Sequence, residues 1–245
     1  MLQTVATVPA HVVILGLGPS LEAYLDIVKR LGSRRRFADE VWAINALGDI
    51  LQCDRVFHMD DVRIQEIRAA ARPQSNIAAM LEWLRNHPGP IYTSRVHNGY
   101  PGLVEYPLAE VINDCGVAYI NNTAAAALAF ANYLGVKEIT FFGCDYTYPN
   151  AHDAERGRAC LEFHIGIAKA RGTKIGLPDR TSLMDALYSQ QDRLYGYDTL
   201  DLELSEEDGR VRVLMTPRGG LPSADEIERR YDHSRPVNPL LRGAA

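Results

Sequence analysis

This sequence has few of the short motifs that would place it directly in a chemical class. Its four cysteines are widely spaced and form no CxxC pair; they are Cys53, Cys115, Cys144 and Cys160. The spacing lacks the usual sequence signatures of zinc sites and redox-active thiols. Reduced thiols in a cytoplasm are the simplest interpretation of such cysteines.

Targeting and membrane-spanning segments are also missing. The N-terminus has no charged region followed by a long apolar region, as a secretory signal peptide would have. No apolar run is long enough to cross a bilayer. The formal net charge of −5 gives no general attraction to polyanions, which weighs against nucleic acid as a partner. We therefore expect a cytoplasmic protein without a membrane span.

The sequence does contain short apolar runs that alternate with segments of helical periodicity. The clearest strand candidates are HVVIL at 11–15, EVWAIN at 40–45, DRVFHM at 54–59 and KEITFF at 137–142, with weaker ones at 90–93, 117–120 and 173–175. Helices are expected at 21–31, 62–71, 76–86, 106–114, 123–134 and 154–170. This alternation predicts an α/β fold, Rossmann-like and doubly wound, with a mostly parallel sheet and helices on both faces.

The pattern changes in the last third of the chain. Residues 1–180 are expected to form a Rossmann-like nucleotide-binding domain, and 181–245 a C-terminal extension. Within the extension, the segments 199–204 and 210–215 flank a turn and predict a β-hairpin. A polar tail follows Pro217.

The turn after the first strand is the best candidate for a phosphate site. It reads Gly16-Leu17-Gly18-Pro19-Ser20 and leads directly into a helix. Glycines let the backbone turn tightly and approach a ligand, Ser20 suits a helix cap, and the free N–H groups of a helix start attract anions. A plain strand-to-helix turn is the alternative, since the sequence matches neither the GxGxxG fingerprint nor a P-loop.

Polar residues also follow the second and third strands. Asn45 can read a base or a ribose, or it is a turn residue before Gly48. Asp60 can hold a ribose hydroxyl or a hydrated Mg²⁺. Asp61 is expected to cap the next helix. His58 lies within the apolar run of the third strand, so we expect it to be structural.

Two later segments complete the candidate site. Asn121-Asn122-Thr123 precedes an alanine-rich helix, where small residues such as Ala124 allow a ligand to approach or let the helix pack tightly. The last clear strand leads into Gly143-Cys144-Asp145-Tyr146, followed by Tyr148 and His152. Tyrosine hydroxyls can donate to phosphate oxygens, and His152 is a candidate general base or a solvated loop residue. Cys144 and His164 are expected to pack in the interior.

Taken in order, these segments resemble two related groups of proteins. The matching segments are GLGPSL at 16–21, WAIN at 42–45, HMDD at 58–61 and NTAAAALAFANYLGVKEITFFGCDY at 122–146, with His152 shortly after. One group is the MptE-like proteins, named for an archaeal 6-hydroxymethylpterin diphosphokinase. The other is the bacterial sialyltransferases that use CMP-sialic acid and modify lipooligosaccharide. The resemblance spans residues 11–155.

The resemblance implies a role for each matching residue. A nucleotide would be held by Gly16–Ser20, Asn45, Asp60 and the Asn122–Ala124 loop. Tyr146 and Tyr148 match the sialyltransferase tyrosines that stabilise the leaving phosphate. His152 matches the histidine that MptE-like proteins often carry after G-x-D, whereas the Tyr-x-Gly-His segment of the sialyltransferases is absent.

The expected function is therefore an enzyme, a nucleotide-dependent group transferase. The leading form is a sialyltransferase-like glycosyltransferase. It would transfer a sugar from a CMP-type nucleotide sugar to a small-molecule or glycan acceptor, as in phage or surface-glycan modification. One alternative is an MptE-like pyrophosphokinase that transfers diphosphate from ATP to a small alcohol, with Asp60 and Asp145 as candidate Mg²⁺ ligands. Another is a non-catalytic nucleotide-binding module. A homodimer is the expected assembly for a cytoplasmic enzyme.

Overall fold

The computed structural model describes residues 8–147, 149–188, 193, 200–207, 209–217 and 224–230. The chain divides into two compact units, residues 1–187 and 188–245, and each is described by itself. The first unit continues past residue 180, since Leu183 is fully buried and the Ser182 hydroxyl donates to the backbone oxygen of Asp145.

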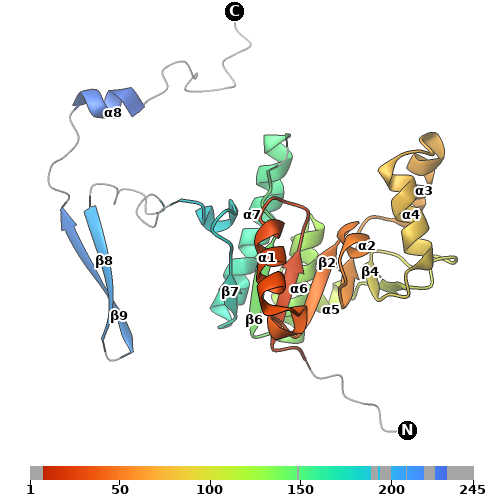
Figure 1. Cartoon of the computed structure of the whole chain (residues 1–245), viewed down its shortest axis with the longest axis horizontal. Coiled ribbons are helices and arrows are strands. Elements are labelled where there is room, and N and C mark those ends of the chain that lie inside the picture. The colour runs from red at the N-terminus through yellow and green to blue at the C-terminus, as the bar shows by residue number, and fades with distance from the viewer. Residues whose placement is uncertain are drawn as a thin grey trace, which may run out of the picture. The chain divides into compact units, whose positions relative to one another are not determined.

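The first unit is built on one seven-stranded sheet in which every pair of neighbouring strands is parallel. The strand order is β5-β4-β3-β2-β1-β6-β7. The strands are β1 (His11–Leu15), β2 (Glu40–Ile44), β3 (Arg55–Phe57), β4 (Ile91–Thr93), β5 (Leu103–Glu105), β6 (Glu138–Phe142) and β7 (Lys174–Gly176). The predicted doubly wound α/β fold is confirmed (Figure 1).

The order of the strands creates a topological switch point. From β1 the chain adds β2 to β5 on one side, and then crosses back to place β6 and β7 on the other side of β1. The connections that leave β1 and β6 therefore diverge, which opens a crevice at the carboxyl ends of these two strands. This is where ligands bind in open α/β sheets.

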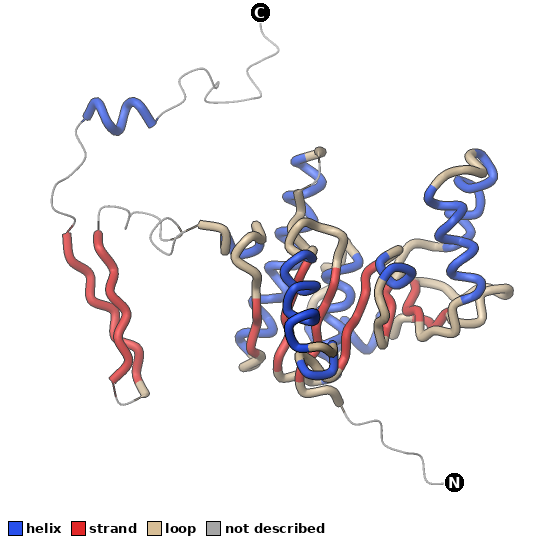
Figure 2. The backbone as a smooth tube through the Cα atoms, in the orientation of Figure 1, coloured by secondary structure: helices blue, strands red, loops and turns tan. Residues whose placement is uncertain are grey.

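Helices cover both faces of the sheet, as the tube in Figure 2 shows. One face carries α1 (Leu21–Leu31) and the short α2 (Leu47–Ile50), and farther along the sheet α3 (Val62–Ala71) and α4 (Asn76–Asn86). The other face carries α5 (Leu108–Cys115), α6 (Thr123–Leu134) and α7 (Ala151–Ala170). Two 3₁₀ turns, η1 (Arg34–Arg36) and η2 (Leu183–Asp185), complete the first unit.

Helix α6 occupies the centre of its face. Its residues from Ala124 to Asn132 are all buried, and it contacts β1, β2 and β3. Alanine side chains let a helix lie close to a sheet, and Phe130 fills the remaining space against Trp42 and Phe57. From Ala124 to Ala131 the helix is thus apolar all round because it is buried all round.

One predicted strand is wrong, and one observed strand was not predicted. Residues 117–120 form no strand, because the carbonyl of Tyr119 accepts from the ring of His164 on α7. The outer strand is instead β5, which lies in a segment rich in turn residues. Only Leu103 of β5 is buried, so its three residues show no alternating pattern in the sequence.

The described part of the second unit contains the predicted hairpin and a short helix. Strands β8 (Leu200–Glu207) and β9 (Arg210–Pro217) pair antiparallel, with Leu204 opposite Val213. Helix α8 (Ala224–Arg230) lies in the segment predicted as a polar tail.

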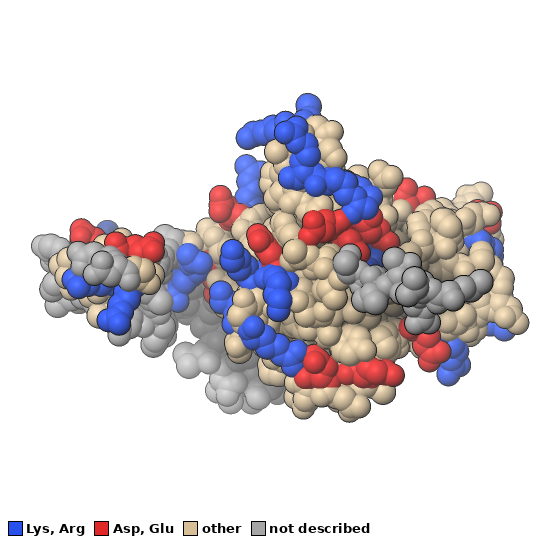
Figure 3. All heavy atoms as spheres, turned by 90° about the horizontal axis from the view of Figure 1, so that it is seen from below, with Lys and Arg blue, Asp and Glu red and all other residues tan. Residues whose placement is uncertain are grey.

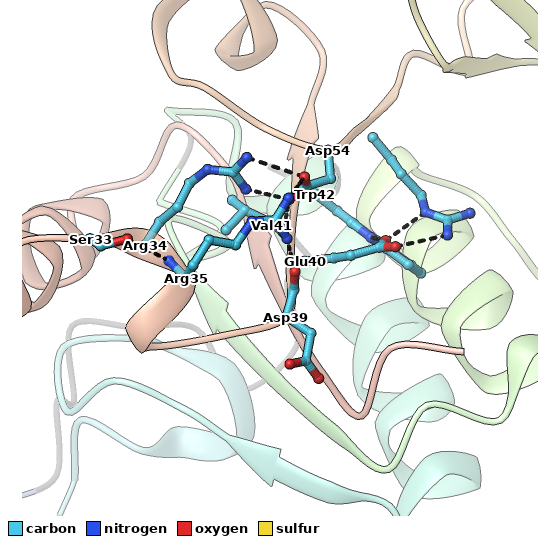
Figure 4. A network of polar contacts seen from close by, with 9 residues as sticks. Ser33, Arg34, Arg35, Asp39, Glu40, Val41, Trp42 and Asp54 are labelled. Carbon is cyan, nitrogen blue, oxygen red and sulfur yellow. Dashed lines mark hydrogen bonds and ion pairs between the residues drawn. The ribbon is translucent and has the colours of Figure 1, made fainter. Parts of the chain in front are cut away.

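A network of ion pairs ties the amino-terminal edge of the sheet together (Figure 4). Arg34 and Arg35 of η1 both bind Asp54, which precedes β3, and Asp54 also accepts from the backbone N–H of Val41 at 2.8 Å. Burial opposes ionisation of Asp54, but these hydrogen bonds and positive charges outweigh it and lower the pKa of the carboxyl. Arg34 and Arg35 therefore hold Asp54, and with it the start of β3, against β2.

This network predicts a pH-dependent contribution to stability. A carboxyl whose pKa is lowered by folding adds stability above its unfolded pKa of about 3.9, and this is lost as pH falls through the folded pKa. We expect Asp54→Asn to lower the free energy of unfolding at pH 7 by about 1.5–3 kcal/mol. The difference from wild type should shrink below about pH 4, as measured by urea unfolding across pH. The exposed Asp179→Asn is the control, and a deficit that is constant with pH would contradict the assignment.

Candidate functional site

A cavity of about 460 Å³ lies at the carboxyl ends of β1, β2 and β6, at the switch point of the sheet. Its volume lies within the range of small-molecule sites. Four segments contribute to its lining: Gly16–Pro19, Ile44–Asn45, Asn122–Ala124, and the residues Gly143, Cys144, Tyr146 and Thr147. The fold therefore brings together most of the residues that the sequence marked as nucleotide-binding.

The loops that follow β1 and β6 touch backbone to backbone. Gly16 donates to the oxygen of Phe142 at 2.8 Å, and Gly18 donates to the oxygen of Gly143 at 2.7 Å. A Cβ on Gly16 would lie 2.4 Å from the oxygen of Gly143, and one on Gly143 would lie 2.0 Å from the oxygen of Gly16. Glycine at these two positions is thus required by the contact between the loops, whatever a ligand also requires.

A carboxylate of the protein occupies the start of helix α1. Asp145 is 1% exposed, and its Oδ2 accepts from the backbone N–H of Ser20 at 2.7 Å. Its Oδ1 accepts from the Ser20 hydroxyl at 2.6 Å, and that hydroxyl accepts from the N–H of Gly143 at 2.7 Å. The expectation that the Ser20 side chain caps α1 is therefore wrong, because this side chain bonds across the two loops instead. An anion at this helix start is favourable, and the chain supplies it internally.

These bonds leave few donors in the predicted phosphate turn. The N–H groups of Gly16, Gly18 and Ser20 all have protein acceptors, and Pro19 has no N–H. Within the turn, only the N–H of Leu17 is left to meet a ligand. The turn shapes the cavity more than it supplies hydrogen bonds to it.

The N-terminus of helix α6 has more unengaged backbone N–H groups at the cavity than the N-terminus of helix α1. Asn122 caps it by accepting from the N–H of Ala125 at 3.0 Å. The N–H groups of Thr123 and Ala124 belong to the first turn, so they have no intrahelical acceptor. Both residues line the cavity, where Ala124 adds little bulk. This end offers two backbone donors and a helix dipole to a bound anion.

Asn45 stands at the cavity wall with an unsatisfied side-chain oxygen. It follows β2 in a left-handed conformation (φ 54), which asparagine tolerates better than most residues. Its backbone N–H donates to the oxygen of Phe57 at 2.8 Å. Its Oδ1 is inaccessible to solvent and has no hydrogen-bond partner in the described structure. Buried side-chain oxygens of native proteins are paired in most cases, so this oxygen is an exception within the described structure.

Tyr146 closes the cavity beside α6. It also has a left-handed backbone (φ 50), and its hydroxyl donates to Oδ1 of Asn122 at 3.0 Å. Its ring packs against Gly157 of α7, where a Cβ would lie 2.6 Å from the ring. Tyr146 thus orders the start of α6, and its predicted contact with a leaving phosphate stays a prediction.

Other predicted residues lie outside the cavity lining. Asp60 accepts from the Gln65 amide at 3.2 Å, and Asp145 faces Ser20, so neither lines the cavity. His152 is exposed on the first turn of α7 and is not a lining residue either. Tyr148 lies outside the described residues. The expected cap of helix α3 by Asp61 is confirmed, since the Asp61 carboxylate accepts from the N–H of Arg63 at 2.9 Å. Asp61 also pairs with His97.

The cavity also contains residues that sequence reasoning missed. Ile44, Cys144 and Thr147 line it, and their position at or shortly after the ends of β2 and β6 was the available signal. Burial raises the pKa of the Cys144 thiol to about 12, so this cysteine is a packing residue and not a thiolate nucleophile. His164 is fully buried, with its Nε2 2.7 Å from the oxygen of Tyr119, as its expected structural role requires.

The described residues that line the cavity carry no charged side chain, since none of them is lysine, arginine, aspartate or glutamate. The face of the molecule in Figure 3 carries both signs of charge among its described residues. Across the described ranges, no group of three or more histidine, cysteine, aspartate or glutamate side chains is placed to hold a metal ion. No helix in the part of the chain covered by the structure is long and apolar enough to cross a membrane.

No family model matches the chain, and a search of curated proteins finds no matching sequence.

The contacts of Asp145 predict a structural effect of its removal. Asp145→Ala leaves the N–H and hydroxyl of Ser20 buried without an acceptor, so the free energy of unfolding should fall by about 1.5–3 kcal/mol. Denaturant unfolding measures this change, with Asp26→Ala, exposed on α1, as the control. Wild-type stability in Asp145→Ala would show that the carboxylate is free for another role.

Proposed function

We propose that this protein is a nucleotide-dependent group transferase whose donor binds in the cavity at the switch point. The observation that carries the proposal is the start of helix α6, where Thr123 and Ala124 line the cavity and their backbone N–H groups have no intrahelical acceptor. The donor phosphate lies against Thr123 and Ala124 rather than in the Gly16–Ser20 turn, whose donors are engaged.

This arrangement suits a reaction in which negative charge develops on a departing phosphate. Backbone N–H groups at a helix start are fixed before the reaction, so they stabilise the charge without reorganising. The helix dipole adds to the effect within its first turn. Asn45 lines the cavity, and its side-chain amide is the group there that can bond to the sugar or base of the nucleotide.

The uncharged lining favours a donor with one phosphate over one with three. A triphosphate needs lysine, arginine or Mg²⁺ to offset its charge, and the lining supplies none of these side chains. Asp60 and Asp145 do not fit a shared Mg²⁺ site for this cavity, because both are hydrogen-bonded elsewhere and neither lines it. We therefore favour a sugar transfer from a CMP-type donor to a hydroxyl acceptor over a diphosphate transfer from ATP.

Nucleotide binding is the first test. A panel of CMP, CDP, CTP, UDP, GDP, ADP and ATP is measured by thermal shift, with Mg²⁺ and with EDTA. A ligand at about 100 times its dissociation constant adds about 2.7 kcal/mol, which raises Tm by several degrees. We expect a shift with CMP that EDTA does not remove. A shift with ATP that requires Mg²⁺ would instead support the diphosphokinase, and no shift with any nucleotide would refute both.

The place of binding is tested by filling the cavity. Ala124→Leu adds bulk at the start of α6, so it should weaken CMP binding at least tenfold in a calorimetric titration. Ala79→Leu, at an exposed position of α4, is the matched control. Unchanged affinity in Ala124→Leu, with Tm close to wild type, would place the nucleotide elsewhere.

A further inference from the structure

A second set of polar side chains lies beside the cavity, in one row across the sheet. The strand register places Ile44 opposite Phe57, and Phe57 opposite Tyr92. The next residues along the three chains are Asn45, His58 and Thr93, so these follow one another across β2, β3 and β4. Phe57 and Tyr92 face α6, so the alternation of strand residues directs His58 and Thr93 to the opposite face, which α3 covers.

This row is buried and its hydrogen bonds are incomplete. His58 is 1% exposed and Thr93 is 0% exposed, while Gln65, on the covering helix α3, is 4% exposed. Both ring nitrogens of His58, the Thr93 hydroxyl and Oε1 of Gln65 have no partner in the described structure, and neither has Oδ1 of Asn45. Buried polar atoms of native proteins are paired with protein or ordered water in the great majority of cases.

The chemistry of the row defines what it can bind. A neutral histidine offers one donor and one acceptor, and threonine offers both on one oxygen. Burial lowers the pKa of His58, against the opposing charge of Asp60, and so favours the neutral ring. No member of the row is charged, and the carboxylate nearest to it, Asp60, accepts from the Gln65 amide at 3.2 Å. The row suits water or a hydroxyl group, which donate and accept at the same atom.

The row also lies next to a cavity whose described lining residues include no histidine or carboxylate to accept a proton. Asn45 belongs both to the row and to the cavity lining. His152 is outside the lining, Asp145 is bonded to Ser20, and Cys144 holds its proton. His58 has unengaged ring nitrogens one strand away from Asn45.

We propose that Asn45, His58, Thr93 and Gln65 form a hydrated branch of the cavity, and that His58 accepts a proton through its water from a hydroxyl group bound in the cavity. The second half of this inference rests on the proposed transferase function. The hydroxyl gives its proton to the water as the water gives one to His58. The hydroxyl oxygen then uses its lone pair to attack the donor, and the departing phosphate keeps the electron pair of the broken bond. His58 is a relay residue in this scheme and does not touch the substrate.

Hydration of the row is tested without any nucleotide. Thr93→Val keeps the shape of the side chain and removes the hydroxyl. In a hydrated row it removes a partner of the water, so we expect Tm to fall by about 2–4 °C. In a dry row it removes an unpaired hydroxyl, so Tm would rise, which overturns the proposal. Thr216→Val, exposed on β9, controls for the change of side chain.

The link to the cavity is tested by NMR of ¹⁵N-labelled histidine in the full chain. The His58 ring signals are identified by their loss in His58→Gln. Addition of CMP should shift these signals in the wild type, since the water responds to the occupied cavity. If CMP binds and the His58 signals stay unchanged, the link is refuted while the proposed function stands.

The proton transfer is tested last, with His58→Gln and His58→Leu. Both variants should keep the Tm shift caused by CMP, because His58 does not contact the nucleotide. Glutamine keeps hydrogen bonds to water but cannot accept the proton, so kcat should fall about 100-fold in both variants while the donor KM changes little. Full kcat in His58→Gln would overturn the relay. If no nucleotide binds at all, the relay fails together with the proposed function, and the Thr93→Val result alone decides the hydrated row.

Discussion

The loops after β1 and β6 touch at Gly16 and Gly143, and the rest of the site depends on this contact. A side chain on either residue would meet the backbone of the other loop. The close approach lets Asp145, three residues beyond the end of β6, reach the start of α1 and bind Ser20. The Asp145 carboxylate thereby offsets the positive end of the α1 dipole. The N-terminus of α6 remains as the helix start whose positive dipole end is available at the cavity.

The alanines of α6 serve the core and the cavity at the same time. Small side chains allow the helix to lie against β1, β2 and β3, where larger ones would push it away. The same absence of bulk leaves space above its first turn, where Thr123 and Ala124 line the cavity. The sequence offered these as competing interpretations, and the structure shows that tight packing and an open helix start occur together.

Much of the fold was predictable from the sequence because buried parallel strands are short, apolar and followed by turns. The segments HVVIL, EVWAIN and KEITFF are of this kind, and each is a central strand. The outer strand β5 escaped prediction because pairing with β4 defines it, and an edge strand needs only one buried side. The segment at 117–120 has residues typical of a strand, but its Tyr119 carbonyl accepts a hydrogen bond from His164 of α7 and forms no strand pairing.

The candidate site was predictable only in part, because sequence places residues at strand ends but not their side chains. Asn45 and Thr123 line the cavity as their positions suggested. Asp145 has the same kind of position, but it points to Ser20. His152 is close in sequence to the lining residues Tyr146 and Thr147, but its side chain is exposed to solvent and does not line the cavity. His58 seemed an ordinary interior residue until the register of three strands placed it in line with Asn45 and Thr93.

The uncharged lining of the cavity also bears on how a ligand arrives. Long-range attraction between unlike charges speeds encounter and weakens as salt screens it. The described lining residues carry no charged side chain, so they add little to such attraction and hold a ligand through hydrogen bonds and dipoles that act at contact. The part of the encounter rate that salt changes then comes from charges elsewhere on the protein, whereas the contacts inside the cavity are little affected by salt.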